Sequence, residues 1–237
     1  FTITLGSAAA VGQGAGLQLL HTSNNEVIHA ANFAFGSQEG MVYAATSGGT
    51  SGIITINGIL SGSNGVTRFG DGILRLSGAN TFTGPLTINA GETRLNNIRA
   101  AGPTGTTPND INLFGGALYF EAANQRYNNN VTFYNDARLS NVNVASTGFN
   151  NLTVAARTGS SAPVVLDIRA NGGGNTTTAY GNFTLNGPAQ IYATHPLQVN
   201  GSLIGTGALE KFGNERLFLN GDSSGYSQPI TVSTGFL

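Results

Sequence analysis

The sequence has 237 residues, of which 35 are glycine and only 9% are charged, against about 25% charged residues in typical globular proteins. Its net charge of −1 excludes strong electrostatic attraction to nucleic acid or acidic lipids, so neither is an expected partner. Cysteine is absent, which excludes disulfides and thiolate metal sites. Hydrophobic residues make up 40% of the chain and form no run of about 18, so we expect a chain folded throughout that does not itself insert into a membrane.

Residues 1–50 have the least regular pattern. Strands are expected over residues 1–5, 17–20, 27–35 and 41–45. In the third of these, apolar residues alternate from Val27 to Phe35, which favours a strand over a short helix. We predict that residues 1–50 form an irregular β segment or cap that covers the first turn of the following domain, because the ends of a solenoid need cover.

From residue 51 onward, short triplets of apolar, polar and apolar residues recur at close intervals. Each triplet points two side chains inward and one outward, as a half-buried strand requires. The triplets are residues 54–56, 74–76, 86–88, 111–113, 118–120, 131–133, 137–139, 142–144, 152–154, 166–168, 183–185, 191–193 and 197–199. Such short strands bury an apolar face only by stacking coil upon coil, about 4.8 Å apart. With about 20 to 25 residues per coil, we expect roughly ten rungs.

Part of this domain is repeated within the sequence. Positions 143 residues apart carry matching side chains, among them Asn57 with Asn200, Phe69 with Phe212, Leu74 with Leu217, and the like-charged Arg68 with Lys211. After one inserted residue the offset becomes 144 and matches Pro85 with Pro229. The insertion falls in a turn, where it costs little, whereas an insertion within a strand would reverse every side chain. We therefore place repeat units at residues 56–95 and 199–237 of a β domain over residues 51–237.

The best-preserved copy resembles a known family. Residues 72–91 read Gly-x-Leu-x-Leu-Ser-Gly-Ala-Asn-Thr-Phe-Thr-Gly-x-Leu-Thr-Ile-Asn-Ala-Gly. This pattern is similar to the autotransporter-associated β-strand repeat, the passenger-associated repeat of bacterial type V secretion; it covers residues 72–95, with a degraded copy at residues 217–237. The resemblance implies an all-β, right-handed parallel β-helix that is secreted and displayed outside the cell. Both ends are then expected to be cuts through a longer solenoid, with any targeting peptide removed and any membrane anchor elsewhere.

Charged and histidine residues offer few candidates for chemistry. His21, His29 and His195 have no metal-ligand spacing and no carboxylate cluster nearby, so no metal site is predicted. Two pairs, Asp136 with Arg138 and Asp167 with Arg169, place opposite charges two residues apart on predicted strands. They can line a polysaccharide-cleaving groove, or they can be solvated outward residues that contribute little to stability. We predict the second, and with it no catalytic residue and no enzymatic activity.

Aromatic and glycine-rich segments each allow a ligand-binding and a purely structural interpretation. Tyr119, Phe120, Tyr127, Phe133 and Tyr134 either stack on sugar rings or divide into two core phenylalanines and three tyrosines at the core margin, and we favour the core. Residues 171–175, Asn-Gly-Gly-Gly-Asn, lack the Lys-Ser/Thr and helix of a phosphate loop and are predicted to be a turn. No calcium site or other cofactor is predicted, and an ice-binding face has only Thr2-Ile-Thr4 in its favour.

Three functions remain open at this stage. The first is a rigid stalk or adhesive contact surface on the outside of a bacterium, with surface glycans or extracellular matrix as partners. The second is a self-assembling subunit of an extracellular fibre or sheath, because open solenoid ends can dock head to tail. The third is a β-helix that binds or cleaves polysaccharide. We favour the first, located extracellularly or on the bacterial outer surface.

Overall fold

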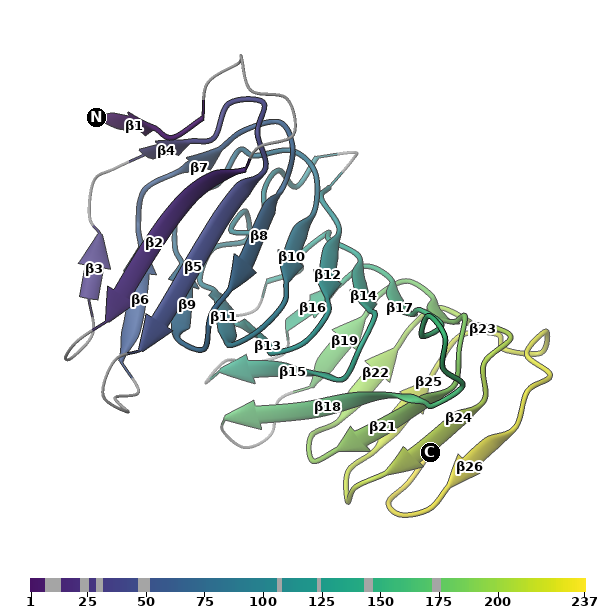
Figure 1. The fold of residues 1–237 in the computed structure, drawn as a ribbon. Helices are drawn as coiled ribbons and strands as arrows, with labels where there is room; N and C mark the ends of the chain where they lie inside the picture. Colours follow the sequence, from purple (N-terminus) through teal and green to yellow (C-terminus); the bar gives the residue numbers. More distant parts are fainter. Residues whose placement is uncertain are drawn as a thin grey trace.

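The molecule is a stack of parallel β-strands (Figure 1). The structure, a computed structural model, describes residues 1–6, 14–21, 26–28, 32–46, 52–105, 108–122, 125–142, 147–171 and 176–237. Within these ranges the chain forms 26 strands and no helix, and so no helix long and apolar enough to cross a membrane. Every strand pair is parallel, which joins successive coils into a parallel β-helix solenoid.

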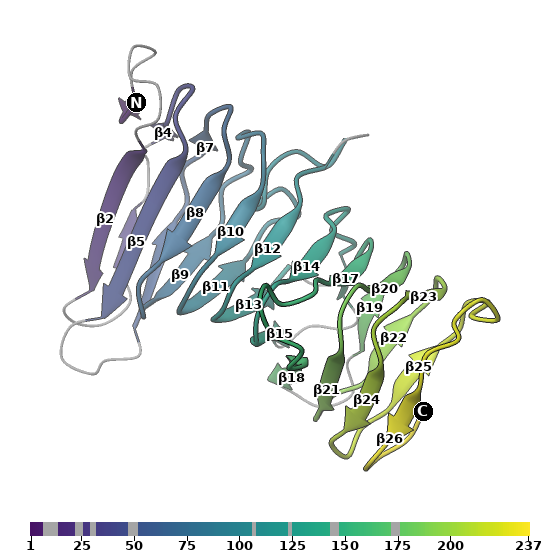
Figure 2. The same ribbon diagram turned by 45° about the vertical axis from the view of Figure 1, so that its right-hand side comes forward.

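Two long sheets run along the solenoid. Sheet B has nine strands, which Figure 2 shows in a row, in the order β2 (Ala15–His21), β5 (Gly40–Thr46), β8 (Val66–Phe69), β10 (Leu86–Ile88), β12 (Ile111–Leu113), β14 (Val131–Phe133), β17 (Leu152–Val154), β20 (Phe183–Leu185) and β23 (Leu203–Gly205). Sheet C has ten strands, which agrees with the roughly ten rungs expected: β3 (Glu26–Ile28), β6 (Ile53–Ile56), β9 (Ile73–Leu76), β11 (Glu92–Leu95), β13 (Ala117–Phe120), β15 (Ala137–Val142), β18 (Val164–Asn171), β21 (Ala189–Ala193), β24 (Leu209–Phe212) and β26 (Ile230–Val232).

Two short sheets occupy the remaining side, between a strand of sheet C and the next strand of sheet B. Sheet A, near the N-terminus, consists of β1 (Thr2–Thr4), β4 (Asn32–Ala34) and β7 (Leu60–Ser61). Sheet D, nearer the C-terminus, consists of β16 (Thr147–Phe149), β19 (Thr177–Ala179), β22 (Leu197–Val199) and β25 (Leu217–Leu219). Strands from residues 1–50 pair directly with later strands in sheets A, B and C, and whether they act as a cap stays a prediction.

On the third side of the solenoid, between sheets A and D, buried asparagine side chains form hydrogen bonds with backbone groups. The Asn80 side chain accepts a hydrogen bond from the Leu60 amide (2.8 Å) and donates one to the Ala100 carbonyl (2.6 Å). One turn further, Asn109 donates to the Phe82 carbonyl (2.8 Å), and Asn129 donates to the Asn109 carbonyl (2.7 Å). Each amide thus satisfies backbone groups that have no strand partner on this side, where burial would otherwise make them costly.

The predicted triplets are confirmed, with one exception. All but residues 142–144 lie within strands; Val142 ends β15 and residues 143–144 lie outside the described ranges. The single strand expected over residues 27–35 is wrong, because β3 belongs to sheet C and β4 to sheet A. The chain therefore passes from one side to the next between them, and Asn32, which begins β4, accepts a hydrogen bond from the Ile59 amide (2.9 Å).

The sequence repeat does not return to the same side of the solenoid. At an offset of 143 residues, β8 of sheet B corresponds to β24 of sheet C, and β9 of sheet C corresponds to β25 of sheet D. Each element of the second copy therefore lies one sheet further round the coil. The repeat encodes a strand, a glycine turn and a second strand, and this unit fits any side because all three sides stack in the same way.

Candidate functional site

Charged side chains gather on the outer surface of sheet C. Outward positions alternate with core positions along each strand, so a charge on one strand lies beside charges on the strands before and after it. We call this surface the charged face; it consists of Arg75, Glu92, Arg94, Glu121, Arg138, Asp167 and Arg169.

The N-terminal half of the charged face is organised around Glu121. Its carboxylate accepts two hydrogen bonds from Arg75, at 2.6 and 2.9 Å, and a third from Arg94 at 3.2 Å. Arg94 also pairs with Glu92, and its guanidinium lies 5.5 Å from the centre of the Tyr119 ring. Bidentate pairs of this kind hold both side chains in a defined geometry. This half of the face therefore presents a fixed pattern of charges.

Of the two predicted charge pairs, Asp167 with Arg169 forms in the structure and Asp136 with Arg138 does not. Arg138 binds Asp167 across neighbouring rungs, with 3.0 Å between Nε and Oδ2, and Arg169 binds the same carboxylate at 2.8 Å. Asp136 pairs with Arg157, 21 residues away, and accepts a hydrogen bond from the Val165 amide (2.7 Å). The pKa of Arg138 is raised by hydrogen bonding to Tyr119 and also by Asp167. Asp167 and Asp136 are thus neutralised by arginines.

A shallow groove of about 500 Å³ follows one edge of the charged face. It is lined by Asp71, Ile73, Gly91, Glu92, Gly116, Ala117, Asp136, Ala137, Arg138, Val165 and Asp167. A general base for proton abstraction needs a carboxylate that is free to approach the proton. Asp136 and Asp167 are each paired with arginine, and Asp71 and Glu92 also line the groove.

Two of the three histidines lie within the described residues, on different parts of the solenoid. His21 ends β2 of sheet B, and His29 lies outside the described residues. His195 is buried between β21 and β22 with 5% exposure, and its Nε2 has no hydrogen-bond partner. Burial lowers the pKa of His195, an effect that Glu215 partly opposes. Within the described ranges, no group of three or more histidines and carboxylates is placed to hold a metal ion.

The aromatic prediction is confirmed for the phenylalanines and wrong for one tyrosine. Phe120 and Phe133 are fully buried, but so is Tyr127, which was expected at the core margin. The Tyr127 ring lies 4.6 Å from that of Phe120, and its hydroxyl donates a hydrogen bond to the Leu95 carbonyl (2.7 Å), which lets a phenol enter the core. Its pKa is raised by burial. Of the glycine-rich turn expected at residues 171–175, residues 172–175 lie outside the described ranges.

Two buried cations lie on strands that the triplet pattern did not predict. Arg68 on β8 and Lys211 on β24 both point into the core and are fully buried. Arg68 donates hydrogen bonds to the carbonyls of Gly70 (2.6 Å), Gly72 and Ala90. Lys211 donates to the carbonyls of Gly213 (2.9 Å) and Thr234 (3.2 Å).

These two cations have equivalent surroundings. Gly213 and Thr234 are the repeat equivalents of Gly70 and Ala90, so the pairing of Arg68 with Lys211 at the 143-residue offset was a signal for their shared role. In each copy a buried cation holds the carbonyls of two glycine turns together. Burial lowers the pKa of both groups, that of Arg68 to about 10.

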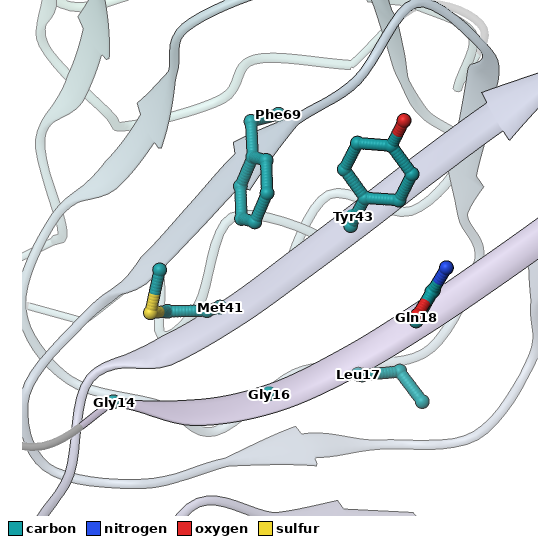
Figure 3. Close-up of a pocket in the computed structure, with 7 residues that line it drawn as sticks. All are labelled: Gly14, Gly16, Leu17, Gln18, Met41, Tyr43 and Phe69. Atoms are coloured by element: carbon teal, nitrogen blue, oxygen red, sulfur yellow. The ribbon is translucent and has the colours of Figure 1, made fainter.

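An aromatic hollow of about 510 Å³ lies on the outer surface of sheet B at its N-terminal end (Figure 3). Tyr43 and Phe69 form one wall, with 5.2 Å between ring centres, and Met41 lies beside them. On β2, Gly16 leaves the hollow open, since a side chain built there would meet nothing within 4 Å. The size and apolar lining are typical of a small-ligand site. The triplets gave no signal for it, because Tyr43 and Phe69 lie outside them.

The stacked parallel strands and short glycine turns define a β-helix solenoid with an extended side wall and shallow surface hollows. Residues 66–95 match the family model described as passenger-associated-transport-repeat, so the chain carries that repeat. The chain is also 35% identical over 116 residues to the "Adhesin BmaC autotransporter" of Brucella suis biovar 1 (strain 1330). The match covers 49% of this chain and 3% of that relative. No solved structure matches the chain.

Proposed function

We propose that the chain is a segment of a secreted, surface-displayed autotransporter passenger, in which it serves as a rigid stalk with adhesive side walls. The similarity to an adhesin autotransporter over about half of the chain carries this proposal. The passenger-associated repeat at residues 66–95 supports the same assignment independently of any one relative.

The architecture suits a stalk. Sheet C stacks ten parallel strands, which gives a wall of roughly 45 Å at the usual strand spacing. Adjacent rungs are tied by backbone hydrogen bonds, by asparagine ladders and by the ion pairs of the charged face. Coupling of each rung to its neighbours resists bending, and it leaves the outward side chains as the surface available to a partner.

The side walls also favour adhesion over catalysis. The candidate carboxylates Asp136 and Asp167 are held by arginines, which leaves the groove with fixed polar groups. An extended surface of such groups makes many weak contacts, and several copies on one cell strengthen them through multivalency. End-to-end association of the solenoid into fibres stays a prediction.

Surface labelling tests this proposal. Antibodies raised against the purified chain should label intact cells of the producing bacterium, and external protease should remove the label. Purified chain added in excess should also lower attachment of those cells to their target surface. Labelling that appears only after permeabilisation of the cells would refute the proposal.

A further inference from the structure

The outer surface of sheet B carries a ladder of threonines. The central outward position of successive strands is in register from β8 to β20, and threonine fills it with a single exception. We call this row the threonine ladder; it consists of Thr67, Thr87, Asn112, Thr132, Thr153 and Thr184. At a strand spacing of about 4.8 Å, its five steps extend for about 24 Å along the solenoid axis.

The hydroxyl groups of this ladder are available to a ligand. Thr67 donates its hydroxyl hydrogen to Glu39. In the part of the chain that the structure describes, the hydroxyls of Thr87, Thr132, Thr153 and Thr184 make no hydrogen bond with other protein groups. All four side chains are partly exposed. They therefore offer donors and acceptors one or two rungs apart on a regular surface.

Aromatic rings run beside the ladder, at the outward positions two residues further along the strands. At the N-terminal end Tyr43 and Phe69 form the wall of the hollow in Figure 3. Two rungs beyond Phe69, Phe114 and Tyr134 stack face to face, with ring centres 4.4 Å apart and planes within 1° of parallel. Phe114 is 42% exposed. We call this row the aromatic column; it consists of Tyr43, Phe69, Phe114 and Tyr134.

The two rows contain no charged side chain, in contrast to the charged face on sheet C. An acidic or basic ligand would therefore gain no ion pair from the ladder or the column. A neutral ligand that carries both hydroxyl groups and apolar C–H surface would fit both rows, because the ladder binds the hydroxyls and the column contacts the apolar surface.

We propose that the threonine ladder and the aromatic column bind a neutral polysaccharide chain that lies along the solenoid axis. Its hydroxyl groups exchange hydrogen bonds with the ladder. Its apolar C–H surface packs against the exposed edges of the column, because Phe114 and Tyr134 turn one face toward each other. The hollow at Tyr43 and Phe69 receives one sugar unit at the N-terminal end. This inference rests on the proposed function, since it names the partner of the adhesive side wall.

Calorimetric titration of the purified chain with neutral hexasaccharides tests this inference. Glucose hexamers with β-1,3 and β-1,4 linkages serve as probes, and hexagalacturonate serves as the charged comparison. We expect a neutral hexamer to bind and hexagalacturonate to bind at least tenfold more weakly. Removal of one stacked ring in Tyr134→Ala should weaken binding about three- to tenfold.

Two further variants test whether the hexamer binds on sheet B. Thr132→Val removes one ladder hydroxyl while keeping a β-branched side chain, so it should weaken binding and leave the melting temperature nearly unchanged. Tyr192→Ala is the matched control, because Tyr192 is also an outward tyrosine beside a phenylalanine, 5.3 Å from Phe212, but lies on sheet C. It should not change binding.

Three results would overturn the inference. They are no binding of either neutral hexamer at millimolar concentration, equal binding of hexagalacturonate, or equal losses in Tyr134→Ala and Tyr192→Ala. Ice binding by the ladder without glycan binding, seen as thermal hysteresis that Thr132→Val removes, would overturn it as well. If neither neutral hexamer binds while surface labelling and competition for attachment are observed, only the glycan assignment fails and the proposed function stands.

Discussion

Replacement of Arg68 by methionine tests whether a buried cation holds the glycine turns together. The guanidinium is fully buried and donates to three carbonyls, those of Gly70, Gly72 and Ala90. Methionine has an unbranched side chain that fills much of the same space but donates no hydrogen bond. Arg68→Met therefore removes three hydrogen bonds to turn carbonyls, of which the Gly72 carbonyl still accepts one from the Glu92 amide (3.1 Å).

The expected loss of stability in Arg68→Met follows from two opposing contributions, the cost of burying the charge and the gain from its hydrogen bonds. Burial lowers the pKa of Arg68 from 12.5 to about 10, which corresponds to a cost of about 3 kcal/mol for keeping the charge. Three hydrogen bonds from a charged donor contribute roughly 5 to 9 kcal/mol in total. The difference favours arginine by a few kcal/mol, so we expect Arg68→Met to lower the free energy of unfolding by about 3 kcal/mol.

Urea unfolding followed by circular dichroism measures this change. Arg68→Lys should keep more than half of the stability difference, because Lys211 already binds the equivalent carbonyls with an ammonium group. Arg169→Met is the matched control; Arg169 is 46% exposed and its partner Asp167 keeps Arg138, so its loss should cost about 1 kcal/mol or less. Equal stability of Arg68→Met and the unmodified chain would refute this explanation of the turns.

Three other predictions follow from the core, the turns and the buried histidine. Phe133→Ala removes a fully buried ring and should lower the free energy of unfolding in urea by about 3 to 5 kcal/mol; a loss below about 1 kcal/mol would contradict its place in the core. Gly213 has φ of 90° and lies against the Ala193 carbonyl, so Gly213→Ala should lower the melting temperature clearly, whereas Gly225→Ala, in open space, should not. Equal shifts in the two glycine variants would contradict the close stacking of turns. The lowered pKa of His195 means that the unfolded chain binds more protons below about pH 6.5, so stability should fall as pH drops below that value. His195→Gln should reduce this pH dependence, and an unchanged slope of stability against pH would contradict the assigned burial.

The sequence was sufficient to predict the solenoid, and several of the strands that the triplets missed share a cause. The triplet pattern depends on apolar residues at both inward positions. β8 and β24 break it because Arg68 and Lys211 occupy inward positions, and β19 breaks it because Thr177 does. A polar residue in the core is stable only with specific partners, and those partners come from other rungs that a local pattern does not include.

The surfaces were harder to predict than the strands. Consecutive strands belong to different sheets, so the threonines of sheet B alternate along the chain with the charges of sheet C. The distance from one rung to the next also varies, from 19 residues between Ile73 and Glu92 to 31 between Leu152 and Phe183. Which outward side chains become neighbours therefore depends on the length of each turn. This is why Arg138 meets Asp167 and not Asp136.

Cysteine crosslinking is the most direct test of the stacked, in-register solenoid. The chain has no cysteine, so two introduced residues would be its only thiols. Thr132 and Thr153 are register partners, which puts their Cα atoms about 4.8 Å apart, within the range of a disulfide. Ala155 lies two residues further along, about 8 Å from Thr132 and beyond that range. We predict that Thr132→Cys with Thr153→Cys forms an intramolecular disulfide under mild oxidation and that Thr132→Cys with Ala155→Cys does not; the reverse result, or equal crosslinking, would contradict the register.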